Sequence, residues 1–182
     1  VGAGVWERYG DEFPLLIKLI DAHEDLSIQV HPDDAYARAH GLGNRGKMEA
    51  WFVLQSDGGR AAFGFRDGVD QHMVERMLAE NELASAVQYH DLNSGDLIFV
   101  PPGIVHALCQ GTVIYEVQQA SDLTFRLYDY NRLGLDGKPR ELHIEAALDV
   151  VRVDSTISGP QPWEQIPETT AAGGLLVECD YF

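Results

Sequence analysis

Short runs of alternating apolar and polar residues follow one another along most of the chain. This alternation is typical of β-strands with one buried face, because successive side chains of a strand point to opposite sides. In the run LSIQVH at 26–31, the three apolar side chains then share one face, and Ser27, Gln29 and His31 share the other. Further strands are predicted at 13–20, 49–55, 61–65, 89–92, 97–100, 104–110, 112–119 and 124–130. Glycine and proline turns separate them, which indicates an antiparallel sandwich, jelly roll or barrel.

Three segments depart from the alternation and predict helices. The longest covers 71–86, where methionine, valine and leucine recur at helical spacing among charged residues, and Asp70 can cap it. A brief helix is expected after the caps Asp33 and Asp34, and a short one over 142–150. The sequence therefore predicts a mainly β protein with a small helical insertion around residues 71–86.

The 182 residues, 45% of them hydrophobic, are enough to bury the core of one domain. We expect residues 1–153 to form the β core with its helical insertion. Residues 154–182 are expected to be a connecting segment and the start of a further strand. The chain begins with Val1 and ends inside a strand-like run, so we expect a longer polypeptide that is truncated at both ends.

Charge and cysteine content exclude several classes of partner. The chain has 29 acidic and 13 basic residues and a formal net charge of −16, which repels nucleic acid and anionic lipid. An anionic metabolite would need a local basic pocket. No apolar run approaches the roughly 20 residues of a membrane helix. Cys109 and Cys179 form no CxxC pair, so we expect a reducing, cytoplasmic compartment. The oligomeric state stays open.

Polar side chains on three strand-like runs are candidates for a metal site. Gln29 and His31 share a strand face, Glu49 lies on an otherwise apolar run, and His106 follows a Pro-Pro-Gly turn. An unpaired imidazole or carboxylate in a protein interior is costly, which favours a shared cation. Nitrogen and oxygen ligands without thiolates suit catalytic zinc, with manganese, iron or nickel as alternatives. The competing interpretation for Glu49 is an internal ion pair with Lys47.

Several motifs in order resemble a known family. A turn that contains an acidic residue and a glycine is followed by an apolar strand and by the pattern PxGxxH at 101–106. This order resembles the pattern of a cupin barrel. The segments QVHP at 29–32, GKMEAW at 46–51, PPGIVHAL at 101–108 and EVQQASDLTFRLYDYNR at 116–132 together resemble the type I mannose-6-phosphate isomerases, particularly the shorter bacterial ones. The resemblance covers nearly the whole chain and implies a cupin-type jelly-roll barrel of antiparallel strands. The chain departs from the family at Met48, where proline or threonine is usual.

The resemblance implies an enzyme that interconverts the sugar phosphates mannose 6-phosphate and fructose 6-phosphate through a cis-enediol, with one Zn²⁺ per chain. The family's zinc ligands fall on Gln29, His31, Glu49 and His106. Its active-site residues fall on Lys47, Asp122 and Arg126. Lys47 and Asp122 are both candidates for the proton shuttle. Arg126 would hold the enediolate or the phosphate, because a guanidinium stays charged and donates in a fork.

Two other classes of function fit parts of the pattern. A non-catalytic metal-binding cupin that senses a sugar phosphate would keep the metal ligands but need not keep Lys47, Asp122 and Arg126. An iron-dependent cupin oxygenase would bind its metal through a histidine-rich set, which a glutamine ligand disfavours. The presence of all three active-site residues favours the isomerase.

Overall fold

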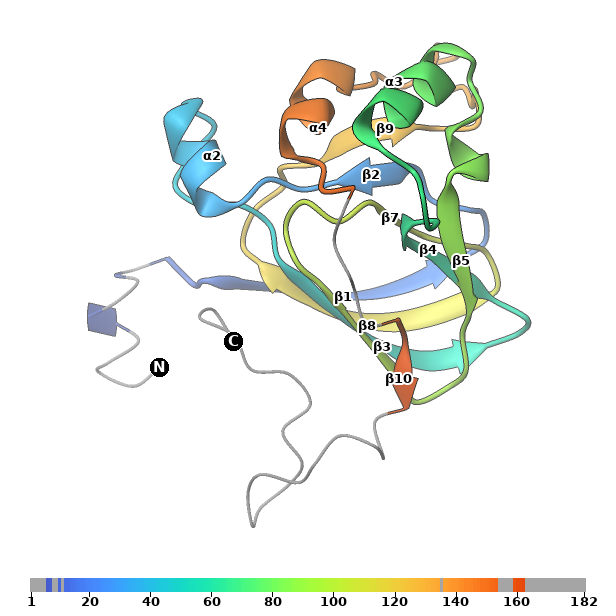
Figure 1. Cartoon of the computed structure of the whole chain (residues 1–182). Helices are drawn as coiled ribbons and strands as arrows, with labels where there is room; N and C mark the ends of the chain where they lie inside the picture. The colour runs from blue at the N-terminus through green and yellow to red at the C-terminus, as the bar shows by residue number, and fades with distance from the viewer. Residues whose placement is uncertain (1–5, 8–9, 11, 135, 154–158, 163–182) are drawn as a thin grey trace.

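The computed structural model describes residues 6–7, 10, 12–134, 136–153 and 159–162. Its strands form two five-stranded antiparallel sheets (Figure 1). In spatial order, the first sheet consists of β1 (Leu15–Ala22), β8 (Thr112–Gln119), β3 (Glu49–Ser56), β6 (Asp96–Val100) and β10 (Gln161–Pro162). The second consists of β5 (Val87–Asp91), β4 (Arg60–Phe65), β7 (His106–Leu108), β2 (Ile28–Val30) and β9 (Phe125–Tyr128). The prediction of a mainly β, antiparallel fold is confirmed.

One apolar cluster fills the space between the two sheets. Trp51 and Ile114 of the first sheet belong to it together with Phe63 and Leu108 of the second, and all four are nearly inaccessible to solvent. Side chains from both inner faces thus form one core, as in other two-sheet proteins. Polar groups on these inner faces are therefore also removed from water.

A second apolar cluster lies on the other face of the second sheet, which the helices cover (Figure 1). The helices are α2 (Asp34–Ala39), α3 (Gln71–Ala79), the 3₁₀ turn η1 (Leu83–Ser85) and α4 (Ile144–Val150). Ile28 and Val30 of β2 pack in this cluster with Val74 of α3 and Ala147 of α4. The alternation of β2 then directs Gln29 to the opposite face, toward the first sheet.

All three predicted helices are present near their predicted positions, but the longest one is shorter than predicted. Asp33 caps α2 and Asp70 caps α3, each by accepting from a backbone amide of the first turn. The predicted helix over 71–86 is wrong as a continuous element, because α3 ends at Ala79. Asn81 has a φ of 60°. A residue in this left-handed conformation cannot continue a right-handed helix, so the insertion resumes only as η1.

Several predicted strands are shorter than expected or shifted. The run 104–110 contains only the three residues of β7, and β2 also has only three. Leu26 precedes β2 and lines a pocket, so it does not share the face of Ile28 as predicted. The short strand β10 lies within residues 154–182, where a connecting segment was expected, and it pairs with β6. The strand expected near the end of the chain lies outside the described residues.

The order of the strands decides which segments meet. In the second sheet, β2 lies between β7 and β9, and Gln29 is opposite His106 on one side and Arg126 on the other. Glu49 begins β3 in the first sheet, whose inner face meets the second sheet. Among the described residues, no helix has the length and apolar character needed to cross a membrane.

Candidate metal centre

Three of the four predicted metal ligands lie together between the sheets. His31, Glu49 and His106 offer ligand atoms that are all within 4.8 Å of one another. His31 Nε2 is 3.1 Å from Glu49 Oε1, and His106 Nε2 is 3.7 Å from Glu49 Oε2. All three side chains are at most 1% exposed. The structure thus brings two imidazoles and one carboxylate, from three separate segments, to one buried point.

The backbone fixes the orientation of both imidazoles. His31 Nδ1 lies 2.9 Å from the carbonyl oxygen of Leu123, and His106 Nδ1 lies 2.8 Å from that of Ile104. A carbonyl can only accept, so each Nδ1 carries the hydrogen and each Nε2 directs a lone pair at Glu49. In metal sites, a hydrogen bond from the other ring nitrogen orients the binding histidine in the same way.

Burial keeps the two imidazoles neutral. It lowers the pKa of His31, and it lowers the pKa of His106 to about 3. A proton on His31 would also act against protonation of His106, because the two ring centres are only 4.7 Å apart. At neutral pH both side chains are therefore in the form that binds a metal ion.

Two polar atoms of the cluster test whether a cation fits. His31 Nε2 and Glu49 Oε1 are fully buried, lie 3.1 Å apart and make no hydrogen bond among the described residues, although Glu49 Oε1 also lies 2.9 Å from the Lys47 ammonium group. Their proximity is not a hydrogen bond, since a lone pair faces a carboxylate oxygen. A buried imidazole lone pair that faces a carboxylate oxygen with no donor between them is costly. A divalent cation between them would satisfy both, so the residues fit a metal ion.

The alternative ion pair of Glu49 is also present. Lys47 Nζ lies 2.9 Å from Glu49 Oε1 and 3.3 Å from the Thr124 hydroxyl, to which it donates. Burial alone would raise the pKa of Glu49, but its interactions with His31, with the ammonium group of Lys47 and with His106 hold that pKa well below its usual range. Lys47 thus helps to keep the carboxylate ionised, but it does not satisfy the imidazole lone pairs.

Gln29 lies at the edge of this cluster. Its Nε2 is 3.5 Å from His106 Nε2, and its Oε1 is 3.4 Å from the Ser27 hydroxyl. The two ends of an amide have nearly the same shape, and rotation by 180° would exchange them. The rotated amide would direct its oxygen at the cluster, as a metal ligand requires.

A pocket of about 350 Å³ opens beside the cluster. The predicted active-site residues Lys47, Asp122 and Arg126 all line it, together with Gln29 and Glu49. Lys47 is nearly buried, whereas Asp122 is exposed. The structure therefore brings the predicted catalytic residues to the same cavity as two of the predicted ligands.

Sequence reasoning missed three charged residues of this pocket, Arg140 and the ion pair of Lys18 with Glu116. Lys18 Nζ is 2.8 Å from Glu116 Oε2, while Trp51 Nε1 donates to Glu116 Oε1 at 2.9 Å and to Glu49 Oε2 at 3.0 Å. Burial raises the pKa of Glu116. Glu116 is opposite Lys18 in β1 and opposite Trp51 in β3. Only the strand register reveals the group of Lys18, Trp51 and Glu116, since these residues are far apart in sequence.

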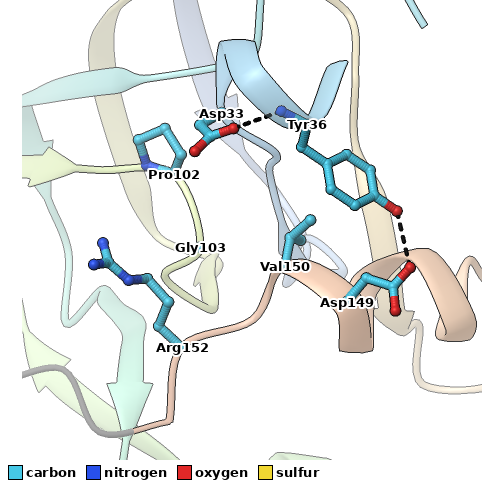
Figure 2. Close-up of a pocket in the computed structure, with 7 residues that line it drawn as sticks. All are labelled: Asp33, Tyr36, Pro102, Gly103, Asp149, Val150 and Arg152. Carbon is cyan, nitrogen blue, oxygen red and sulfur yellow. Dashed lines mark hydrogen bonds between the residues drawn. The ribbon is translucent and has the colours of Figure 1, made fainter. Parts of the chain in front are cut away.

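A second pocket, of about 300 Å³, lies between α2 and the end of α4 (Figure 2). It is lined by Asp33, Tyr36, Pro102, Gly103, Asp149, Val150 and Arg152. Inside it the Tyr36 hydroxyl donates to Asp149 at 3.1 Å. None of the predicted metal ligands or catalytic residues lines this pocket. Of these two pockets, the one beside Glu49 is therefore the one that the predicted ligands and catalytic residues line.

This chain is similar to known proteins in both sequence and fold. The family model "Phosphomannose isomerase type I, catalytic domain" matches residues 2–48. The probable mannose-6-phosphate isomerase GmuF of Bacillus subtilis is 41% identical over 175 residues, covering 95% of this chain and 55% of that protein. The mannose-6-phosphate isomerase ManA of the same organism is 38% identical over 191 residues, covering 98% and 59%. The chain therefore spans just over half the length of these relatives.

The crystal structure of the mannose 6-phosphate isomerase from B. subtilis superposes with a TM-score of 0.83 at 34% identity, covering 97% of this chain and 59% of that one. This match confirms the cupin-type fold. A zinc-bound mannose 6-phosphate isomerase, at 19% identity and a TM-score of 0.64, shares the fold. Sequence identity over nearly the whole chain, the family model and the common fold agree, and the chain belongs to the type I phosphomannose isomerase family.

Proposed function

We propose that the protein interconverts mannose 6-phosphate and fructose 6-phosphate at the pocket beside Glu49. The names of the relatives support this substrate. The observation that carries the proposal is the pair of neutral imidazoles whose lone pairs face one buried carboxylate. This cluster adjoins a cavity that could hold a sugar and that Lys47, Asp122 and Arg126 line.

The proposed cofactor is one Zn²⁺ per chain, held by Gln29, His31, Glu49 and His106. The donor set of nitrogen and oxygen atoms without thiolates supports zinc, as does the zinc-bound relative of the same fold. When bound, zinc would polarise the sugar carbonyl and stabilise negative charge on the enediol oxygens, an effect of several kcal/mol. The single carboxylate leaves a net positive charge on such a site.

Proton transfer between carbons 1 and 2 is assigned to Lys47, whose neutral amine would take the proton from one carbon and whose resulting ammonium group would return it to the other. The Lys47 ammonium group lies beside Glu49 at the buried end of the pocket, whereas Asp122 is exposed. A general acid or base must reach the reacting carbon within hydrogen-bonding distance, and this favours the group nearer the ligands. Asp122 is then left to bind a sugar hydroxyl, and Arg126 to stabilise anionic oxygens.

The proposed partner is a small sugar phosphate, and the proposed compartment is the cytoplasm. The strongly negative net charge argues against nucleic acid and anionic lipid as partners. The cysteine content supports a reducing compartment. A non-catalytic sensor would not require the three predicted catalytic residues to line one cavity, so the isomerase is preferred.

Removal of the metal is expected to abolish isomerisation. The test is a coupled assay that follows fructose 6-phosphate formed from mannose 6-phosphate by the protein that carries this sequence. A chelator should reduce the rate to background, and added zinc should restore it, because only the occupied site can stabilise the enediol charge. A protein that binds zinc and sugar phosphate without turnover would instead be a sensor, and chelator-resistant turnover would contradict the metal-dependent mechanism.

A further inference from the structure

One buried carboxylate organises the arginines at one wall of the pocket. Asp129 is 5% exposed and accepts from both Arg132 and Arg140. Arg140 binds it through two atoms, Nε to Oδ2 at 2.6 Å and Nη2 to Oδ1. Burial alone would raise the pKa of Asp129, but these two guanidiniums hold it below its usual value. Asp129 therefore stays ionised and fixes the plane of the Arg140 guanidinium.

Arg140 faces the pocket, whereas Arg132 does not. Arg132 directs its donors at Asp129 and at the backbone carbonyl oxygen of Asp25. Arg140 uses Nε and Nη2 for Asp129, and its Nη1 has no hydrogen-bond partner among the residues that the structure describes. The two arginines thus share one counter-ion, but only Arg140 can offer donors to a molecule in the pocket.

Arg126 lies in the same wall with a donor to spare. Its Nε donates to the Ser27 hydroxyl at 3.3 Å and its Nη1 to the Glu141 carbonyl oxygen at 2.8 Å. No partner for Nη2 exists within the described part of the chain. Burial lowers the pKa of Arg126, and the positive charge of Arg140 lowers it further. A dianion bound by both guanidiniums would relieve this repulsion.

The two arginines are arranged in order away from the metal ligands. His106 in β7 is opposite Gln29 in β2, and Gln29 is opposite Arg126 in β9. On the side of β9 away from β2, the His143 backbone amide donates to the Arg126 carbonyl oxygen at 2.8 Å. This hydrogen bond holds the segment that follows Arg140 against β9. The backbone order from the metal ligands is therefore β7, β2, β9 with Arg126, and then the segment that follows Arg140.

We propose that Arg140, held in place by Asp129, binds the phosphate group of the sugar substrate together with Arg126. This inference rests on the proposed function and assigns the other end of the same substrate. A protein with a net charge of −16 needs local positive charge to hold a phosphate, and a guanidinium fork matches phosphate geometry. Because carbon 6 is the far end of the sugar from carbons 1 and 2, its phosphate would lie away from the metal.

The test compares Arg140→Met with the matched control Arg132→Met in the zinc-loaded protein. Both changes remove one guanidinium from Asp129, but only the first removes a pocket donor. Steady-state kinetics with mannose 6-phosphate, inhibition by inorganic phosphate and zinc content are measured for each variant. For Arg140→Met we expect KM and the phosphate inhibition constant to rise at least about tenfold, with zinc retained. Arg132→Met should change the inhibition constant by less than about twofold.

Arg140→Lys guards against a folding defect, because lysine keeps the charge near Asp129 but cannot form a fork with both the carboxylate and a phosphate. It should show weakened phosphate inhibition with normal zinc content. Equal losses in Arg140→Met and Arg132→Met, unchanged phosphate inhibition in Arg140→Met, or loss of zinc from the Arg140 variants would each overturn the assignment. Absence of turnover in the unmodified protein would instead refute the proposed function, and phosphate binding measured by calorimetry would still decide the role of Arg140.

Discussion

Glu49→Gln is expected to remove the bound zinc and abolish isomerase activity together. Glu49 is the one carboxylate of the cluster, it is buried, and both imidazole lone pairs face it. A neutral amide of the same shape cannot balance the cation in this interior. We expect zinc affinity to fall by more than about 100-fold, since even the loss of an outer-shell partner costs about 10- to 100-fold. Zinc content by mass spectrometry and the coupled assay are the two measurements.

Glu116→Gln is the matched control for this experiment. Glu116 is also buried in the pocket wall and accepts from the same Trp51 indole, but it is not among the grouped ligands. Its replacement should leave the zinc content at the level of the unmodified protein. Circular dichroism should establish that both variants are folded. Full zinc occupancy in Glu49→Gln, or equal zinc loss in both variants, would show that Glu49 is not a ligand.

Lys47→Met should slow turnover severely while zinc stays bound. If Lys47 moves the proton between carbons 1 and 2, its loss should lower kcat by about 10²- to 10⁴-fold, the usual contribution of general acid-base catalysis. Exchange of deuterium from solvent into the sugar should fall in parallel. The bound zinc would take over from the ammonium group in balancing the charge of Glu49, so the metal should remain.

Asp122→Asn separates the two candidate shuttles. Asp122 is exposed at the pocket, so its amide variant should weaken substrate binding and retain deuterium exchange. Abolished exchange in Asp122→Asn with normal exchange in Lys47→Met would reverse the assignment. Zinc loss from Lys47→Met would show that Lys47 supports the metal site and would remove the evidence for its role in proton transfer.

Local alternation was sufficient to place some of the candidate residues on their faces. The pattern around Gln29 predicted that it would share a face with Ser27, and both line the pocket. Ile28 and Val30 pack under the helices on the other side, as their apolar character requires. This inference succeeds because the side-chain period of a strand depends only on neighbouring residues.

Contacts between distant segments could not be predicted in the same way. Lys18 and Glu116 meet because β1 pairs with β8 in one particular register, which no local pattern specifies. Arg140 lies outside every strand, and its link to Asp129 depends on the path of the chain after β9. The break at Asn81 depends on a left-handed backbone conformation within a sequence of helical periodicity.

We propose above all that His31, Glu49 and His106 bind one metal ion. Anomalous diffraction at the zinc edge, from crystals of the zinc-loaded protein, tests it most directly. We expect one zinc peak between the three side chains, at about 2.0 to 2.2 Å from both Nε2 atoms and a Glu49 oxygen. A zinc peak at any other group, with Lys47 still bound to Glu49 and the imidazoles without metal, would contradict it.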